Sequence, residues 1–407
     1  MISVDDAKAI IESNIKILGV EKVHLKNIEN RILAEDIIAK IPSPLFNNSA
    51  MDGFALRSSD ILGATNSNPV KLKLVSISSA GSPTGVFLKR GECIQCMTGA
   101  KIPEGADTIV MVEDTSGFNE NKFIKFFSEV LLGKHIRKKG EEVKEGSCLI
   151  SKGTRITPSE VGVLATFGYA SASVYRQPKV GIFGTGNELV DPGSELKPGQ
   201  IYNSNLYVFS DLVKKTGSQI ITQNVIEDDK STLKKFLKNA LKTCDVIISS
   251  GGVSMGKYDY VREVFMELGV HEGFWKVAQK PGKPLFFGYK NSKIVFGLPG
   301  NPVSSYIGFM IWVWPALEKM MGENKSSSVF AILKEEFPLE KQKYRFLFGK
   351  AWIEDGILLC KPSTKLGSHM LSSSIDANCI IGSKKGSDHL QPGDKVNIKL
   401  LPWKNLK

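Results

Sequence analysis

Three glycine-rich turns are the clearest chemical signal in this sequence. They are Gly184–Glu188, Ser249–Ser254 and Gly297–Pro302, and each follows a short apolar run. Glycine lets the backbone approach a ligand and present its N–H groups, and the N-terminus of a following helix adds partial positive charge. Phosphate is the ligand that such turns favour, although a tight turn also needs glycine for structural reasons. The candidate substrate-binding residues in these turns are Gly251, Gly252, Pro299, Asn301 and Pro302.

A second signal is a group of closely spaced lysines in the segment Trp275–Pro284, namely Lys276, Lys280 and Lys283. The prolines and the glycine of this segment prevent a regular helix through its second half. Ammonium groups held on a stiff backbone suit a tetrahedral or phosphoryl anion. A solvated lysine-rich surface is the alternative, and this stretch alone leaves both open.

Carboxylates stand close to the turns. Glu188 lies in the first turn, Asp228 follows an apolar run, and Asp259 comes just after the second turn. Mg²⁺ is bound in proteins through one or two carboxylates, with water and phosphate oxygens completing its shell. We therefore expect a magnesium site that uses Asp228 and Asp259. For Asp228 the alternative is a helix N-cap, because a helical pattern begins just after it.

Other kinds of chemistry find little support. Cys93 and Cys96 form a CxxC pair without a second pair, in a stretch that alternates like a strand, so buried small side chains are the better interpretation. The five histidines show no metal-ligand spacing. Neither a zinc site nor a histidine-based mechanism is favoured.

Size and charge narrow the class of protein. A chain of 407 residues is long enough for several domains. The net charge of +11 is spread widely, and the densest basic run, Lys134–Lys139, is followed at once by glutamates. That run fits a solvated face or an anion-facing one, and no aromatic-basic groove for nucleic acid is evident. The N-terminus reads as a helix capped by Ser3 and not as a signal peptide, and the apolar stretch Val303–Leu317 is too short to span a membrane. We expect a cytoplasmic protein with no nucleic-acid or membrane partner.

The part of the chain after about residue 178 alternates between strands and helices. Strands are expected at Val180–Phe183, Gln219–Ile226 and Asp245–Ser249. Helices are expected at Leu206–Thr216, Lys230–Lys242 and Tyr260–Leu268. This pattern predicts βαβ units and a largely parallel sheet, with ligands bound at the carboxyl ends of its strands. The three glycine turns would then be neighbours at one edge of the sheet.

The flanking regions have a different pattern. After the first helix, short β-branched runs such as Lys71–Ile77 and Asp107–Glu113 alternate with Gly, Pro, Asn and Ser, which is typical of a β-rich module. Thr157 and Pro158 mark another helix start. Beyond about residue 326 short alternating runs return and end in Gln391–Leu400, which indicates a small β-barrel. The fold class is thus α/β plus β, in several domains.

Several of these motifs resemble those of a known family. The chain resembles the MoeA family of molybdopterin molybdenumtransferases, which includes the E domain of gephyrin. The resemblance covers almost the whole length and rests on the segments Asn48–Ala55, Met97–Ala100, Gly186–Leu189, Ser250–Ser254 with Asp259–Tyr260, Lys280–Pro284 and Gly297–Ser304.

This resemblance implies an elongated, four-domain homodimer. In it, the α/β domain of one subunit would face the N-terminal region of the other. The implied boundaries are 1–177 for the N-terminal region, 178–326 for the α/β domain and 327–407 for the barrel. The N-terminal region would comprise two interleaved domains, about 1–20 plus 41–50 plus 141–177, and 21–40 plus 51–140.

The resemblance also implies a reaction and a set of site residues. Adenylylated molybdopterin and molybdate would give molybdenum cofactor and AMP, with Mg²⁺ assisting. Asp52, Thr98 and Glu142 would lie on the N-terminal wall of the site, where Glu142 replaces the usual aspartate and reaches one methylene further. The carboxylates Glu188, Asp228 and Asp259 would lie on the α/β side. Further residues implied for molybdate or phosphate are Ser254, Ser304, Arg345 and Ser372.

Two alternatives belong to other classes. A molybdopterin adenylyltransferase uses a similar α/β domain but is typically that domain alone, and a dimeric scaffold would need no carboxylates around an anion site. Contact with such an adenylyltransferase and with recipient molybdoenzymes is a further expectation. An assay for AMP release from adenylylated molybdopterin, Mg²⁺ and molybdate would separate these functions.

Overall fold

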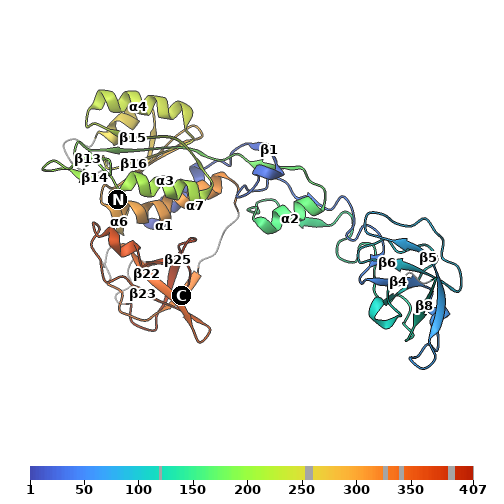
Figure 1. Ribbon diagram of the computed structural model, residues 1–407. Coiled ribbons are helices and arrows are strands. Elements are labelled where there is room, and N and C mark those ends of the chain that lie inside the picture. The colour runs from blue at the N-terminus through green and yellow to red at the C-terminus, as the bar shows by residue number, and fades with distance from the viewer. Residues whose placement is uncertain (119–121, 253–259, 324–328, 339–342, 384–389, 407) are drawn as a thin grey trace. The chain divides into compact units, whose positions relative to one another are not determined.

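The computed structural model describes residues 1–118, 122–252, 260–323, 329–338, 343–383 and 390–406. The chain forms two compact units, shown in Figure 1. The larger unit contains Met1–Glu35, Lys152–Pro158 and Ser171–Lys407, and the smaller one contains Asp36–Ser151 and Ser159–Ala170. These units are coarser than domains, so the boundaries expected from the sequence stay a prediction.

A six-stranded sheet organises the larger unit. Its order is β15-β12-β16-β20-β19-β17, and the first four of these strands are parallel. The last two pair antiparallel at one edge. The strands are β12 (Lys179–Thr185), β15 (Gln219–Ile226), β16 (Val246–Ser250), β17 (His271–Trp275), β19 (Phe286–Lys290) and β20 (Lys293–Leu298). The predicted largely parallel sheet is confirmed.

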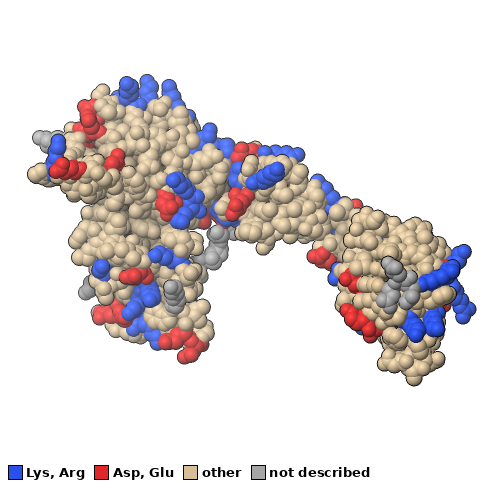
Figure 2. Space-filling view, viewed as in Figure 1, with Lys and Arg blue, Asp and Glu red and all other residues tan. Residues whose placement is uncertain are grey.

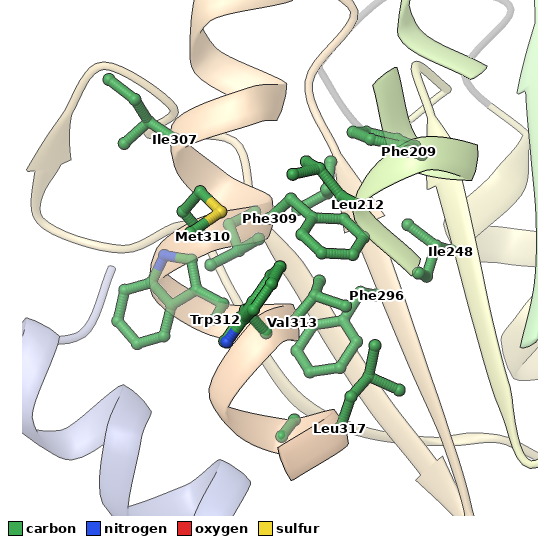
Figure 3. Packing of buried hydrophobic residues seen from close by; sticks show 14 of the residues in the cluster. Phe209, Leu212, Ile248, Phe296, Ile307, Phe309, Met310, Trp312, Val313 and Leu317 are labelled. Carbon is green, nitrogen blue, oxygen red and sulfur yellow. The ribbon is translucent and has the colours of Figure 1, made fainter. Parts of the chain in front are cut away.

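Helices cover both faces of this sheet. Successive side chains of a strand point to opposite faces, and the strands of this sheet contribute buried side chains to a hydrophobic core on each face. Val180 and Ile182 belong to one core, whereas Phe183 belongs to the other. The first core packs against α1 (Val4–Asn14), α3 (Asn205–Thr216) and a continuous helical segment made of α6 (Pro302–Gly308), a π-helical turn (Phe309–Val313) and α7 (Trp314–Met320). Figure 3 shows part of this core. The second core packs against α4 (Lys230–Thr243) and α5 (Val261–Glu267).

Local signals account for the ends of these helices. Ser3 caps α1, since its hydroxyl oxygen accepts the Asp6 backbone N–H at 3.0 Å, as expected. Gly217 ends α3 in the left-handed conformation, with φ 88°. Asn301 and Pro302 begin α6 as predicted, although the Asn301 side chain makes no capping bond and its amide donates to Ser368 Oγ instead.

Basic side chains gather on α4, where they are visible along the upper edge of Figure 2. Lys230 donates to Glu263 and Lys234 donates to Glu267, both at 2.6 Å, across to α5. Glutamates of α5 therefore neutralise part of the positive charge of α4.

A small barrel follows the α/β sheet, as predicted. It closes among the described residues in the order β22-β23-β21-β25-β24, because β24 also pairs with β22. The short strand β18 (Gln279–Lys280) comes from the segment that precedes β19 and pairs parallel with the start of β22. The barrel strands are β21 (Val329–Leu333), β22 (Tyr344–Glu354), β23 (Ile357–Pro362), β24 (Cys379–Gly382) and β25 (Lys395–Leu400).

Short elements complete the larger unit. Two strand pairs are β1 (Val20–His24) with β11 (Ser171–Tyr175), and β13 (Leu189–Val190) with β14 (Ile201–Tyr202). The 3₁₀ turns are Leu25–Asn27 and Leu371–Ser374. No helix in the described ranges has the length and apolar character needed to cross a membrane.

The smaller unit is β-rich, as predicted. Its main sheet has the order β7-β4-β6-β5-β8. Its elements are β2 (Ile37–Ile38), β3 (Asn48–Ser49), β4 (Gly53–Leu56), β5 (Val70–Ser78), β6 (Glu92–Cys96), β7 (Thr108–Met111), β8 (Phe123–Phe126), β9 (Ile136–Arg137), β10 (Cys148–Ile150), the 3₁₀ turns Ser58–Ile61 and Val112–Asp114, and α2, which starts at Pro158 and ends at Thr166.

The CxxC pair lies in β6, with both side chains buried. Burial raises the pKa of the Cys93 thiol to about 12 and that of Cys96 to about 11. Both thiols are therefore protonated at neutral pH, which disfavours metal binding and thiolate chemistry. The interpretation of these cysteines as buried core residues is confirmed.

Candidate functional site

The three glycine turns meet at one cavity. They follow β12, β16 and β20, which are adjacent and parallel, so their carboxyl ends lie at the same edge of the sheet. The cavity has a volume of about 650 Å³. Among the predicted residues it is lined by Glu188, Asp228, Gly251, Gly252, Pro299, Asn301 and Pro302.

Two of these turns favour glycine, for different reasons. Gly252 has a φ of 72°, and a Cβ there would lie 2.2 Å from Cγ2 of the buried Val261, so packing excludes a side chain. Gly186 has a φ of 143°, a backbone conformation that residues with a side chain rarely adopt. As a result, bare backbone faces the cavity, which is compatible with both the structural and the phosphate-binding interpretation.

Asp228 and its neighbour Asp229 have separate positions. Asp229 is the N-cap of α4, and its Oδ2 accepts the Thr232 N–H at 2.7 Å. This hydrogen bond lowers the pKa of Asp229. Asp228 lines the cavity. The helix N-cap considered as the alternative role of Asp228 is therefore Asp229 instead.

Of the two residues predicted to hold magnesium, Asp228 is described and Asp259 lies outside the described residues, as does the predicted substrate-binding residue Ser254. The carboxylates of Glu188 and Asp228 both line the cavity and offer the hard oxygen donors that Mg²⁺ prefers. No group of three or more His, Cys, Asp or Glu suited to a metal occurs in the ranges that the structure describes. If an ion bound here, Glu188 and Asp228 would supply the described carboxylate oxygens, and water and phosphate would complete its shell.

A second cavity, of about 680 Å³, adjoins the first and shares Pro284, Pro299, Asn301 and His369 with it. Its described lining contains four basic side chains and no carboxylate. Those basic side chains are Lys280, Lys283, Lys343 and Arg345. The lining thus favours an anion, and we call this second cavity the basic lobe.

Two predicted residues in the lining of the basic lobe are buried. Ser304 and Arg345 are both buried and both line it. The pairing of β18 with β22 places Lys280 opposite Arg345 in the register. The α/β domain and the barrel therefore both supply cations to the same cavity.

Two predicted and described residues of the larger unit lie outside both cavities. Lys276 has a φ of 71°, and its Nζ lies 3.7 Å from the centre of the Trp275 ring. Ser372 accepts a hydrogen bond from Lys365 Nζ at 3.0 Å. Neither belongs to the described lining of the two cavities, so close spacing in the sequence did not bring Lys276 together with the other two lysines.

The structure adds Asn205 and His369 to the site. Asn205 Nδ2 donates to Ser250 Oγ and to the Gly300 carbonyl oxygen, both at 2.7 Å, and so joins two of the glycine turns. His369 lines both cavities. The sequence gives only a weak signal for Asn205, since an asparagine at a helix start is usually interpreted as an N-cap. It gives none for His369, because the five histidines are scattered and show no motif.

The predicted residues of the smaller unit form two local arrangements. Asp52 Oδ1 accepts the Thr98 backbone N–H at 2.7 Å and the Thr98 hydroxyl at 2.8 Å. These two bonds, the backbone one first, lower the pKa of Asp52. Glu142 Oε2 accepts the Ser43 hydroxyl at 2.6 Å. Asp52 and Thr98 thus act as a pair, with the carboxylate held ionised.

Comparison with known families covers nearly the whole chain. Residues 2–168 match the MoeA N-terminal region (domain I and II), residues 181–319 match a probable molybdopterin binding domain, and residues 331–401 match the MoeA C-terminal region (domain IV).

Individual relatives agree with these matches. The chain is 36% identical over 389 residues to the molybdopterin molybdenumtransferase of Bacillus subtilis, covering 95% of this chain and 90% of that protein. It is 35% identical to the enzyme of the same name from Haemophilus influenzae, covering 93% of each. A crystal structure of a molybdopterin biosynthesis MoeA protein from Pyrococcus horikoshii superposes with a TM-score of 0.82 at 33% identity, covering 98% of this chain and 99% of that one.

Proposed function

Because this chain belongs to the MoeA family, we propose that it is a molybdopterin molybdenumtransferase that joins molybdate to adenylylated molybdopterin and releases AMP. The observation that carries the proposal is the pair of adjoining cavities. One has glycine turns and carboxylates, as a phosphorylated substrate with a divalent cation requires. The other is basic, as an oxyanion requires.

The first cavity would hold the phosphates of the adenylylated substrate. Backbone N–H groups of the glycine turns and the N-terminus of α3, where Ser204 and Asn205 line the cavity, would supply hydrogen bonds and partial positive charge. Asn205 would keep the second and third turns at a fixed separation. These groups orient the phosphate–phosphate bond whose cleavage releases AMP.

Magnesium is a further part of the proposal. Asp228 and Asp259 would hold it, with Glu188 nearby. When bound, Mg²⁺ would neutralise charge on the phosphate oxygens. The resident carboxylates would otherwise repel an anionic substrate, so their presence on this cavity supports a cation there.

The basic lobe would hold molybdate. Lys280, Lys283 and Arg345 line one cavity and can donate hydrogen bonds to an oxyanion there. Ser304, which also lines this cavity, would add a hydroxyl. A doubly charged tetrahedral oxyanion would thus be held next to the phosphate site, as transfer to the pterin requires.

We further propose a cytoplasmic homodimer whose active site uses both subunits. The candidate residues fall in both units of the chain: Asp52, Thr98 and Glu142 in the smaller one, and the cavities in the larger. In the arrangement implied by the family, the Asp52–Thr98 pair of one subunit would serve the cavities of the other. Contact with a molybdopterin adenylyltransferase and with recipient molybdoenzymes fits the same pathway position.

The experiment supplies purified protein with adenylylated molybdopterin, Mg²⁺ and molybdate, and measures AMP by chromatography. We expect AMP release that depends on molybdate and on Mg²⁺. A parallel reaction with unmodified molybdopterin and ATP tests the adenylyltransferase alternative, which would release pyrophosphate. Absence of both products from folded protein would overturn the enzymatic proposal and favour the scaffold.

A further inference from the structure

The loop that carries Lys280 and Lys283 is closed at its base. The Val277 N–H donates to the Lys283 carbonyl oxygen at 3.1 Å, and the Lys276 N–H donates to the Leu285 carbonyl oxygen at 2.9 Å. On one side the loop is tied to the barrel through β18. These bonds fix the ends of the loop but leave open what supports its tip at Gly282.

The side chain of Gln279 fills the interior of this loop. Gln279 is only 1% exposed. Its Nε2 donates to the Gly282 carbonyl oxygen at 2.9 Å, and its Oε1 accepts the Trp312 Nε1–H at 3.1 Å. The orientation of the amide is determined by these partners, because a flipped amide would oppose donor to donor and acceptor to acceptor. One buried side chain thus links the loop tip to Trp312.

Trp312 belongs to the rigid core of the larger unit. It is 2% exposed and lies in the π-helical turn between α6 and α7. Figure 3 shows it within the cluster that includes Phe309, Met310 and Val313. π-Helical turns are rare and are often found near functional sites. The indole N–H is therefore a fixed point from which Gln279 can hold the loop.

The loop tip is shaped to receive the amide. Gly282 has a φ of 82°, and a Cβ there would lie 3.0 Å from Gln279 Nε2. A side chain at this position would press on the amide as well as strain the backbone. The fit between Gly282 and Gln279 is therefore close, and the hydrogen-bonded unit leaves little room for the loop to shift.

We propose that Gln279 and Trp312 position the Lys280–Lys283 loop and thereby set the affinity of the basic lobe for its oxyanion. Gln279 and Trp312 are positioning residues and not catalytic ones. The side chain of Gln279 bonds Trp312 and Gly282, and the indole N–H of Trp312 bonds Gln279. This inference rests on the proposed function only in naming molybdate as the oxyanion. Loss of the Trp312 N–H should let the Gln279 amide and the loop tip move, so that the two ammonium groups no longer face one ligand.

The first test is independent of catalysis. Trp312→Phe removes the indole N–H and keeps an aromatic ring, and Trp314→Phe is its matched control. Trp314 is also buried in the same helical segment. The centre of its ring lies 5.6 Å from the centre of the Trp403 ring. The backbone N–H groups of Val277 and Gln279 donate to the Lys283 and Val277 carbonyl oxygens at 3.1 and 2.8 Å. Their hydrogen exchange should accelerate about tenfold in Trp312→Phe and much less in Trp314→Phe. Equal exchange in the two variants would overturn the positioning role.

The second test measures the consequence for the oxyanion. Equilibrium dialysis with radiolabelled molybdate gives the dissociation constant of the intact protein, and AMP release gives KM for molybdate and kcat. We expect Trp312→Phe to raise both molybdate constants about five- to tenfold with little change in kcat. Gln279→Met, which keeps the length and removes donor and acceptor, should have the same effect, and the double variant should be no worse than either single one.

These outcomes separate this inference from the proposed function. Wild-type protein that fails to release AMP contradicts the proposed function, while the exchange measurement still decides whether Gln279 and Trp312 hold the loop. Active wild type together with an unchanged molybdate dissociation constant and KM in folded Trp312→Phe contradicts the positioning role alone.

Discussion

Asp229 caps helix α4 while Asp228, one residue earlier, faces the cavity at the end of the parallel strands. Asp229 Oδ2 accepts the Thr232 N–H at 2.7 Å, and the Asp228 backbone N–H donates to Asn187 Oδ1 at 3.4 Å. The second bond joins Asp228 to the first glycine turn. Adjacent carboxylates are thus divided between the stability of a helix and the lining of the candidate site.

This division predicts opposite effects for two neighbouring substitutions. Asp228→Asn keeps the shape and removes the charge from the cavity, so AMP release should fall about 100-fold with little change in melting temperature. Asp229→Ala removes the N-cap, so it should lower the melting temperature and leave AMP release per folded molecule nearly unchanged. Calorimetry and the AMP assay on both variants provide the measurement. A lower melting temperature in Asp228→Asn together with a loss of AMP release in Asp229→Ala would contradict these assignments.

The elements around this site were predictable because their signals are local. The helix expected at Leu206–Thr216 is found at Asn205–Thr216, and the strand expected at Gln219–Ile226 is found with those bounds. The meeting of the three glycine turns followed from the rule that parallel strands end at one edge. The helix expected at Lys230–Lys242 starts at the predicted residue, so the residue before it, Asp229, is the N-cap, and the expected start already disfavoured Asp228 as the cap.

Contacts between distant residues set the limit of sequence reasoning. Lys276 is close to Lys280 in sequence, yet its left-handed backbone and its contact with the Trp275 ring leave it outside the cavity linings. Gln279 and Trp312 are 33 residues apart, and neither residue type signals the bond between them. Lys343 and Arg345 reach the basic lobe only because β22 pairs with β18, a long-range pairing that local patterns do not encode.

The Asp52–Thr98 pair should show a specific pH response. Hydrogen bonds from Thr98, the backbone N–H first, hold the pKa of Asp52 below its ordinary value of 3.8. Thr98→Val removes the hydroxyl bond and keeps the backbone bond, so the pKa of Asp52 should rise and still remain below 3.8. NMR titration of the Asp52 carboxyl carbon measures this. An unchanged pKa in the variant would contradict the contribution of the hydroxyl.

The sign of the effect on stability follows from the same shift. A carboxylate whose folded-state pKa is depressed stabilises the fold above the unfolded-state pKa, and this contribution is lost as the pH falls through the folded-state pKa. Thr98→Val should therefore be less stable than wild type at neutral pH, and the difference should shrink in acid. Urea unfolding at several pH values provides the comparison. A difference that grows in acid would have the wrong sign.

The shared active site can be tested by mixing two inactive subunits. Asp52→Ala impairs the smaller unit and Asp228→Ala impairs the cavity of the larger one. In a mixed dimer, one composite site would contain both intact residues, so random mixing should restore about a quarter of wild-type activity. Activity is measured as AMP release after verified subunit exchange. No recovery in confirmed mixed dimers would show that each subunit contains its own complete site.

The lysines of the basic lobe should control the response to molybdate. Lys280→Ala or Lys283→Ala removes a charged donor, so the molybdate concentration for half-maximal AMP release should rise about tenfold or more. The melting temperature should change little. Lys276→Ala is the matched comparison, because its ammonium group lies over the Trp275 ring, and it should change molybdate dependence less. An equal rise of the half-maximal molybdate concentration in all three variants would contradict the assignment of molybdate to the basic lobe.

The last prediction concerns Asn205, which joins the turns after β16 and β20 by donating to Ser250 Oγ and the Gly300 carbonyl oxygen. Asn205→Asp keeps the size, removes both donors and places a carboxylate beside a carbonyl oxygen, so the two turns should separate. KM for adenylylated molybdopterin should rise about tenfold, because backbone N–H groups from both turns would no longer face the same phosphates. KM for molybdate should change less, since Lys280 and Lys283 lie on a different loop, although Pro299 and Asn301 of the third turn also line the basic lobe. Asn224→Asp is the control, because Asn224 donates to Thr222 on an exposed part of β15. A normal KM for the pterin substrate in folded Asn205→Asp would show that the turns keep their positions without this link.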